Sequence, residues 1–551
     1  MSARFLRCIG QSLVVALAFS AVSTAVTHAA SPGQLDPSFG LHGQVTVPLV
    51  TSVAHGGLAV QPDGRLLLAG PSDGFGAVRL TRSGQPDASF GSGGVVRLAS
   101  PAGARATVVA VDPQGRILMA GPLGKKFSDG VLVARVGTDG RPDLTFGRGG
   151  EVMLSPPPGG SGSHRQPDSP VTLVRVAVEA STGGPALLTD TGALIRLDGS
   201  GAVRGGRTAD GWTSLLSTSP SPHYNTETFA ADLVSLPQGH LAVLQHTNTT
   251  DSGLKCGSGA SRVIAIDTPG NVNADFAPTL PFSDFAAVKQ LLVDRDGQLV
   301  IPGGEGMCED SNGLPSHSVL GRLLPDGRTD RGFGVGGSVN EPDIADFAPY
   351  LAAQDTTGAY LAAGKDSLAR IDAHGKPDLS FGDCGVSSPR FYGDPKAMVV
   401  QPQGPLVVAE DADNQKGTLL VAVTLNGQRN PHVRADLLSF ERLGTNELLD
   451  GLTPARLLRH KMVGQLISTQ DATVRIQIVV KGHRSTLTLA QGTARLSGCR
   501  PTKIRLHVTA AGATRVRALN HSGHAISVTE VFRLTNRHGR RVTTDTIDFG
   551  N

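Results

Sequence analysis

The sequence predicts an all-β chain in which a seven-bladed β-propeller, closed by its amino-terminal strand, precedes a small β-sandwich. Three observations lead to this prediction. A phrase of the form Asp-x-Ser-Phe-Gly recurs along the chain, the intervals between its copies hold short apolar runs separated by glycine turns, and the last unit lacks a piece that the amino terminus supplies. Repeats of this length, each offering four short strands, are typical of propeller blades.

The recurring phrase sets the period of the repeat. Its Phe residues lie 51, 56, 57 and 48 residues apart, and one interval of 130 residues spans two units, one of which has lost the phrase. We predict that the Asp caps a turn and that the Phe packs between blades. The structural repeat residues are Asp36, Phe39, Gly40, Asp87, Phe90, Gly91, Asp143, Phe146, Gly147, Asp275, Phe276, Asp330, Phe333, Gly334, Asp378, Phe381 and Gly382.

A single unit is clearest between Gly57 and Leu98. Its turns Gln61–Gly64 and Thr81–Gly84 end in Asp-Gly and Ser-Gly, where glycine accepts the positive φ that hairpin turns require. Apolar runs joined by such turns indicate antiparallel strands. The four strands expected in this unit are Leu58–Val60, Arg65–Gly70, Gly76–Leu80 and Val95–Leu98.

The two ends of the repeat are complementary. The seventh unit, Met398–Gly427, has three predicted strands but neither the Phe-Gly phrase nor a fourth strand, and residues 34–49 are that missing piece. We therefore expect Val45–Pro48 to pair with the segment around Leu420–Thr424. Such a splice would join both ends of the ring by backbone hydrogen bonds and remove open sheet edges.

These motifs resemble the bacterial delta-60 repeat. The resemblance rests on Asp-x-Ser-Phe-Gly, on Gln-Pro-Asp-Gly-Arg-x-Leu-x-Ala-Gly and on Arg-Leu-x-x-x-Gly, and it covers roughly residues 33–430. It is weakest at Ala202–Gly205 and around 220–262, where blade boundaries depart from the pattern. The resemblance implies a propeller found in exported and surface proteins, and it implies no catalytic residues.

The amino terminus has the order of a secretory signal peptide over residues 1–30. Arg4 and Arg7 precede the apolar run Leu13–Phe19, and small residues lead to a break after Ala29 or Ala30. The alternative is a membrane anchor, but the run is short for a span and no later apolar run approaches about 20 residues. We expect a secreted or cell-surface protein with no transmembrane helix after signal removal.

Four cysteines remain after the signal peptide: Cys256, Cys308, Cys384 and Cys499. An exported chain meets an oxidising environment, and Cys256 and Cys308 fall in equivalent loops of consecutive repeats, so we predict a disulfide between them. The alternative is four isolated thiols. Because no cysteines or histidines have the spacing of a zinc site, we expect neither metal nor cofactor.

The pattern changes after the repeat. The propeller is expected over residues 31–430, a linker and first strand region over 431–465, and an immunoglobulin-like β-sandwich over 466–551. In the last region apolar and polar residues alternate, as expected of strands with one buried face. The alternating runs are Thr473–Ile478, Thr486–Leu489, Lys503–Val508, Arg515–Ala518 and Ala525–Val528.

Charge is divided unevenly between the two parts. Residues 431–551 contain 18 Lys and Arg against 8 Asp and Glu, whereas the rest of the chain is acidic overall. A basic face could bind anionic envelope polymers or the acidic propeller, and the alternative is a solvated strand face. Nucleic acid is not expected as a partner, because aromatic rings are too sparse there for base stacking.

Two spellings of catalytic motifs lack the context that catalysis needs. Gly70–Gly74 fits a serine nucleophile elbow but is expected to join two strands, whereas the motif requires a strand turning into a helix. Gly332–Gly337 spells a dinucleotide fingerprint but is one copy of the repeat phrase. Neither is taken as a site.

The sequence therefore favours a secreted, monomeric, non-enzymatic propeller that acts as a binding or scaffold module for an unknown protein or glycan of the cell envelope. The insertions Ser155–Pro170 and Thr213–Phe229 mark the face expected to bind. The alternative is a propeller hydrolase or lyase acting on extracellular polysaccharide, with carboxylates from several blades at the central channel.

Overall fold

The computed structural model places most of the chain in short antiparallel strands. It describes residues 31–549 apart from 51–52, 54, 71–73, 158–169, 180–181, 216–224, 251–257, 268–269, 277, 279–289, 304–317, 341–350, 365–366, 383, 390, 392, 413–416, 427–439, 443–461, 469–470, 482–484, 501, 523–525 and 537–538. The predicted signal peptide, residues 1–30, therefore lies outside the described residues, as do Cys256 and Cys308. Across the described part, no helix is long and apolar enough to cross a membrane.

Seven small antiparallel sheets make up residues 31–426 of the described chain, here called the repeat region. Sheets 1 to 3 are β2 (Leu58–Val60), β3 (Leu66–Ala69), β4 (Phe75–Leu80) and β5 (Val95–Leu98); β6 (Val108–Val111), β7 (Ile117–Pro122), β8 (Val131–Val136) and β9 (Glu151–Leu154); and β10 (Leu173–Val178), β11 (Pro185–Thr189), β12 (Ala193–Arg196) and β13 (Thr213–Ser214). These sheets reproduce the four-strand unit that the sequence predicts.

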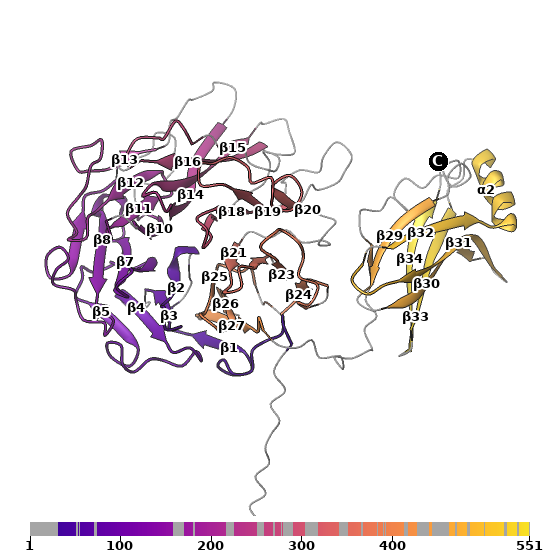
Figure 1. Cartoon of the computed structure of the whole chain (residues 1–551), viewed down its shortest axis with the longest axis horizontal. Helices are drawn as coiled ribbons and strands as arrows, with labels where there is room; N and C mark the ends of the chain where they lie inside the picture. Colours follow the sequence, from indigo (N-terminus) through magenta and orange to yellow (C-terminus); the bar gives the residue numbers. More distant parts are fainter. Residues whose placement is uncertain are drawn as a thin grey trace, which may run out of the picture.

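The remaining sheets follow in chain order. They are sheet 4, with three strands, β14 (Asn225–Ser235), β15 (Leu241–Thr250) and β16 (Ser258–Ile266); sheet 5, β17 (Leu292–Val293), β18 (Leu299–Pro302), β19 (Ser318–Leu323) and β20 (Ser338–Asn340); sheet 6, β21 (Leu351–Gln354), β22 (Tyr360–Ala363), β23 (Leu368–Ile371) and β24 (Val386–Ser387); and sheet 7, β25 (Ala397–Val400), β26 (Leu406–Asp411) and β27 (Thr418–Val423) with β1 (Gln44–Val47). The arrangement is β-propeller-like (Figure 1).

The predicted pairing of the two ends is confirmed. β1 runs antiparallel to β27, with Val45 opposite Leu420 and Val47 opposite Thr418. The turn before β1 also belongs to sheet 7, because the N–H of Gly33 donates to the oxygen of Thr424 at 2.8 Å. The last sheet therefore contains the first and the last strands of the repeat region.

Neighbouring sheets contact one another through their first strands. β2 contacts β6, β6 contacts β10, β10 contacts β14 and β14 contacts β17; further along, β21 contacts both β18 and β25, and β25 contacts β2. The hydrophobic clusters lie between adjacent sheets, and one of them joins Leu58 and Val78 of sheet 1 to Val407 and Leu420 of sheet 7. Sheet 7 therefore packs against sheet 1.

Two segments noted in the sequence lie in connections between strands. Gly70–Gly74 joins β3 to β4, two paired antiparallel strands, so no helix follows its serine. The insertion Thr213–Phe229 is not wholly a loop, because it contains β13 and the start of β14.

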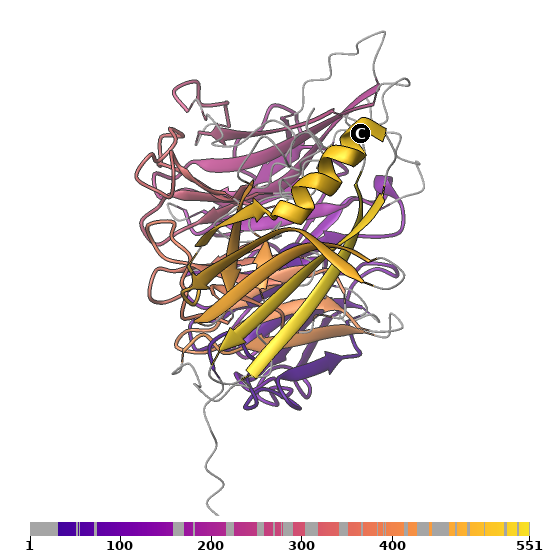
Figure 2. The same cartoon turned by 90° about the vertical axis from the view of Figure 1, so that its right-hand side faces the viewer.

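In the part of the chain after the repeat, here called the C-terminal module, the described strands form one antiparallel sheet of seven rather than the two sheets of a sandwich. Figure 2 shows it with the helix α2 (Ala510–Ser522) beside the sheet. The strand order is β28 (Phe440–Arg442), β29 (Met462–Ser468), β32 (Thr502–Val508), β31 (Thr486–Leu496), β30 (Ala472–Lys481), β33 (Ile526–Asn536) and β34 (Gly539–Phe549).

The predicted strand Arg515–Ala518 is wrong, because these residues lie in α2. Four alternating residues fit a strand or a helix equally well, and the longer alanine-rich stretch around them has high helix propensity. Thr509 caps the helix, since its hydroxyl accepts a hydrogen bond from the N–H of Gly512 at 2.9 Å. Val516 of α2 packs into the hydrophobic cluster of β30 to β33.

Candidate functional site

The repeat phrase forms a capped turn, as predicted. In sheet 1, Asp87 Oδ1 accepts hydrogen bonds from the Ser89 N–H at 3.0 Å and from the Ser89 hydroxyl at 2.7 Å. The same pair of bonds joins Asp36 to Ser38, Asp143 to Thr145, and Asp378 to Ser380. This is the turn chemistry expected of a short acidic side chain followed by a hydroxyl residue.

One predicted repeat residue is shifted by two positions. In sheet 4 the N–H that bonds back to the third strand belongs to Asn273, which donates to Ala265 O at 2.8 Å. The side-chain oxygen of Asn273 also accepts from the N–H of Asp275. Asn273 therefore takes the place of Asp87, and Asp275 takes the place of Ser89. In the other copies the Asp stands three residues before the Phe, which is the position of Asn273, whereas Asp275 directly precedes Phe276.

The Phe and Gly of the phrase lie where adjacent sheets meet. Phe90 is completely buried, and a Cβ on Gly140, in the turn of the next sheet, would lie 3.0 Å from its ring. The N–H of Gly91, whose φ is +54°, donates to Asp139 O of the same turn at 3.1 Å. Equivalent bonds link Gly40 to Ser83, Gly147 to Ser200, Gly334 to His374 and Gly382 to Pro32.

An arginine on the third strand completes this contact, and the sequence reasoning missed its role. Arg79 Nε lies 2.8 Å from Asp87 Oδ2, and its guanidinium carbon is 4.3 Å from the centre of the Phe90 ring. The same group donates to the backbone oxygen of Thr138 in sheet 2. One side chain therefore joins the capped turn, the buried ring and the next sheet.

The arginine recurs in three further sheets. Arg135 Nε is 2.8 Å from Asp143 and its Nη1 donates to Gly199 O at 2.8 Å. Arg322 and Arg370 likewise pair with Asp330 and Asp378 and bond to Ala373 O and Leu425 O of the next sheet. The signal was present in the sequence: each arginine stands eight residues before the Asp of its phrase.

Hydrogen bonding keeps the capping carboxylates ionised. Burial raises the pKa of Asp87, but the bonds from Ser89 and the charges of Arg79 and Arg65 outweigh it and hold that pKa below its usual value. Burial acts on the pKa of Asp143 in the same way, and the bonds from Thr145 and the charge of Arg135 again lower it. These carboxylates are structural ion-pair partners.

The centre of the repeat region also holds polar contacts between sheets. Arg175 of β10 lies 3.2 Å from Asp232 of β14, whose other oxygen accepts from the N–H of Leu291 at 2.8 Å. The short 3-10 helix η1 (His55–Gly57) contacts β6, β10 and β25, the first strands of three other sheets. The buried carboxylate of Asp232 thus links sheets 3, 4 and 5.

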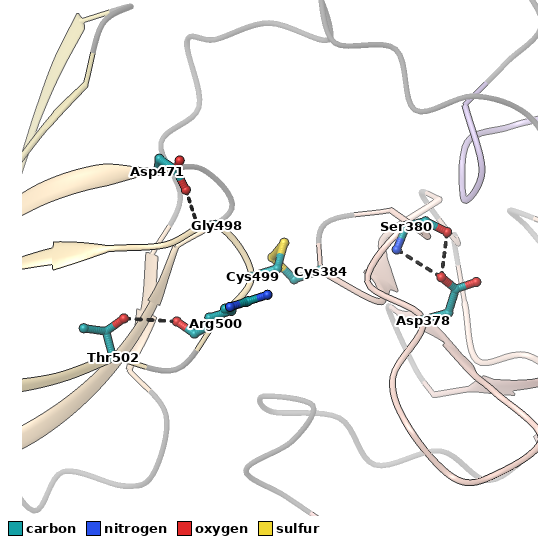
Figure 3. Close-up of a disulfide and its surroundings, with 8 residues drawn as sticks. All are labelled: Asp378, Ser380, Cys384, Asp471, Gly498, Cys499, Arg500 and Thr502. Carbon is teal, nitrogen blue, oxygen red and sulfur yellow. Dashed lines mark hydrogen bonds between the residues drawn. A yellow bond between two sulfur atoms is a disulfide. The ribbon is translucent and has the colours of Figure 1, made fainter.

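A disulfide joins the repeat region to the C-terminal module. Cys384 and Cys499 are bonded, with Cα atoms 5.0 Å apart (Figure 3). Cys384 follows the phrase Phe381–Gly382, at the position that Gly93, Gly149 and Gly336 occupy in other copies. In those copies φ is positive and a Cβ would meet nothing within 4 Å, so this position directs a side chain away from its own sheet.

Cys499 lies at the tip of the β31–β32 hairpin in the C-terminal module. The N–H of Arg500 donates to Ser497 O, and the N–H of Gly498 donates to Asp471 Oδ1 at 2.8 Å. Both cysteines have positive φ, 58° and 59°. The sequence predicted a Cys256–Cys308 bond and no bond for Cys384 and Cys499. If the predicted bond forms, these two are the only cysteines of the mature chain left to pair with each other.

The C-terminal module has a shallow open pocket of about 510 Å³. It is lined by Arg475, Gln491, Gly492, Thr493, His507, Val508, Thr509 and Ala510. Arg475 donates to the Gln491 oxygen at 3.0 Å. In the described residues, no three His, Cys, Asp or Glu side chains group as metal ligands.

No family model and no curated protein matches this chain. Among solved structures, PorZ, a surface component of the type-IX secretion system of Porphyromonas gingivalis, is similar with a TM-score of 0.33 and 11% identity; the match covers 89% of this chain and 58% of that chain. A chain of the mitotic checkpoint complex has a TM-score of 0.36 and 11% identity, covering 76% of this chain and 99% of that chain. The chain thus spans little more than half of the PorZ chain.

Proposed function

We propose that this protein is an exported, non-enzymatic binding protein in which a closed seven-bladed propeller of the delta-60 repeat type holds the C-terminal module on a rigid frame. The partner is a component of the cell envelope or its surroundings. The observation that carries the proposal is the Cys384–Cys499 disulfide, because such bonds form and persist in oxidising compartments outside the cytoplasm.

Two further features support a rigid frame. The amino-terminal strand pairs with β27, and Arg79 and Arg135 each bond their own sheet to the next one. Rigid frames of this kind suit binding, because loops held on fixed strands need little ordering when a partner docks. The buried carboxylates Asp87 and Asp143 pair with these linking arginines, which supports a structural role for them.

The binding face is tested with loop deletions. Purified protein lacking the signal peptide should bind the isolated cell envelope of the source bacterium. Removal of 158–169, which joins β9 to β10, or of 216–224, which joins β13 to β14, should abolish that binding while the circular dichroism spectrum stays unchanged. Binding that survives both deletions would assign the partner to another surface.

Export is tested separately, so that the two claims can fail independently. Alkaline phosphatase is fused to the full chain and, separately, to the chain without residues 1–30. The first fusion should give phosphatase activity outside the cytoplasm, and the second should not. Absence of phosphatase activity from both fusions, with both present in the cells, would contradict export.

A further inference from the structure

We propose that the exposed face of the C-terminal sheet is a binding site for an acidic polysaccharide. This goes beyond the proposed function by adding a second binding surface, outside the repeat region, and it rests on the proposed export of the chain.

The face is defined by strand register. Arg475 of β30 stands directly opposite Arg533 of β33 and opposite Thr493 of β31. Directly opposed residues of antiparallel strands point to the same side of a sheet. By the same register and the alternation along each strand, the face also includes Thr473, Gln477, Gln491, Arg495, Arg505, His507, Thr535 and Arg540.

Most of the charged side chains described on this face are open to solvent, whereas Val531, which lies opposite Gln477 on the same face, is buried. Arg475, Arg495, Arg505, His507 and Arg540 are exposed, and Arg533 is partly buried. The alternate residues of β30, such as Val474 and Ile476, form the hydrophobic cluster on the opposite side with α2. The repeat region therefore leaves the basic face uncovered.

The charges on this face are uncompensated, in contrast to those of the repeat region. Arg79, Arg135, Arg196, Arg322 and Arg370 of the repeat region all pair with carboxylates. Within the described residues, none of the face arginines forms a salt bridge; Arg475 and Arg533 bond to the amide oxygens of Gln491 and Gln477 instead. Like charges placed directly opposite each other destabilise a sheet, which points to an anionic ligand.

The ligand chemistry follows from the side chains between the arginines. Neighbouring strands of a sheet lie about 4.8 Å apart. Guanidinium groups carried by neighbouring strands can therefore bind carboxylates that repeat along a polymer. Thr473, Thr493, Gln477 and Gln491 offer hydrogen bonds suited to sugar hydroxyls. Among the described face residues His507 is the only ring, so the face lacks the aromatic platforms on which nucleic-acid bases stack. The pocket lined by Arg475 and His507 has room for one saccharide unit.

The test uses the full chain without residues 1–30 and fluorescein-labelled polygalacturonate oligomers. Fluorescence anisotropy should show binding that weakens about tenfold or more between 50 and 300 mM NaCl, because the contacts are ionic. The double variant Arg475→Gln/Arg533→Gln should weaken binding at least tenfold. The control Arg148→Gln/Arg515→Gln removes the same charge from exposed positions off this face and should change binding less than twofold.

Three results would overturn the proposal. They are polygalacturonate binding no tighter than that of neutral labelled dextran, equal loss of binding in the control and face variants, and tighter binding of single-stranded oligothymidylate than of polygalacturonate. Thermal melts of all variants show that the sheet is folded. Because the cell-envelope assay uses loops of the repeat region, a failure here leaves that assay untouched.

Discussion

The guanidinium of Arg79 donates a hydrogen bond to the backbone oxygen of Thr138, which belongs to the next sheet along the chain. The same side chain neutralises Asp87, so the link between two sheets and the cap of one turn depend on one residue. The side chain of Arg79 is 3% exposed and that of Asp87 is 8% exposed, which makes this a buried pair.

Removal of Arg79 is expected to be strongly destabilising. Arg79→Met leaves Asp87 with only the partly exposed Arg65, whose Nε also lies 2.8 Å from its carboxylate. Breaking one side of a buried pair costs about 3–5 kcal/mol, which is therefore the upper limit expected here. The measurement is the shift of the urea unfolding midpoint. The control is Arg141→Met, since Arg141 pairs with Asp139 at 3.6 Å with a side chain 88% exposed, and such a surface pair is worth about 0–1 kcal/mol. Equal shifts of the two midpoints would show that the buried Arg79–Asp87 pair contributes no more to stability than the surface pair does.

Stability should fall in acid because of the same turns. The pKa values of Asp87 and Asp143 are lowered in the folded state, so the folded chain binds fewer protons than the unfolded chain. Their contribution is present above the unfolded value of about 4 and is lost as the pH falls through the folded values. Melting temperatures measured from pH 7 to pH 2 should drop below about pH 4. Asp87→Asn should flatten that drop, and an unchanged pH profile would contradict the assignment.

The disulfide should hold the two fragments together after the chain is cut between the two cysteines. A tobacco-etch-virus protease site inserted at 451, between β28 and β29, allows cleavage of the purified protein. One band is expected on a non-reducing gel and two bands on a reducing gel. Cys384→Ser is the control and should give two bands on both. Two bands from the unaltered cysteine pair without reductant would rule out the bond between Cys384 and Cys499.

The amino-terminal strand should be replaceable by a peptide. A chain that begins at residue 50 lacks β1 and leaves the edge of β27 unpaired, and such edges promote aggregation. We expect this truncated protein to melt at a lower temperature and to aggregate. A synthetic peptide of residues 31–49 should restore the melting temperature, whereas a scrambled peptide of the same composition should not. Equal behaviour of the truncated and full chains would contradict the role of β1.

Much of the fold could be predicted because the same pattern of residues recurs in several copies of the repeat. The turn after Leu58–Val60 and the turn capped by Asp87 follow from local residue chemistry that recurs in several copies. The pairing of Val45 with Leu420 follows from the piece that the last unit lacks and the amino terminus supplies. The ion pairs were harder, because an arginine on an apolar strand looks like a solvent-facing residue until the next sheet is placed beside it. Arg79 is an instance, since its partner Thr138 is 59 residues away.

The C-terminal module was harder to predict because its pattern occurs only once in the chain. Arg515–Ala518 alternates like a strand, yet the cap at Thr509 and the alanines around it select a helix, and no second copy was there to reveal this. The Cys384–Cys499 bond depends on how two different parts of the chain meet. Nothing local to either cysteine carries that information, although the open glycine position taken by Cys384 is visible in the repeat.

The shared sheet 7 also fixes an order of events during biosynthesis. The hydroxyl of Thr418 bonds to Val50 O across 368 residues, and β1 has no partner strand until β27 has been made. A nascent chain therefore keeps its first strand unsatisfied through nearly the whole synthesis of the repeat. Completion of the last sheet is consequently a late step, and a chaperone that shields residues 44–47 has that entire interval in which to act.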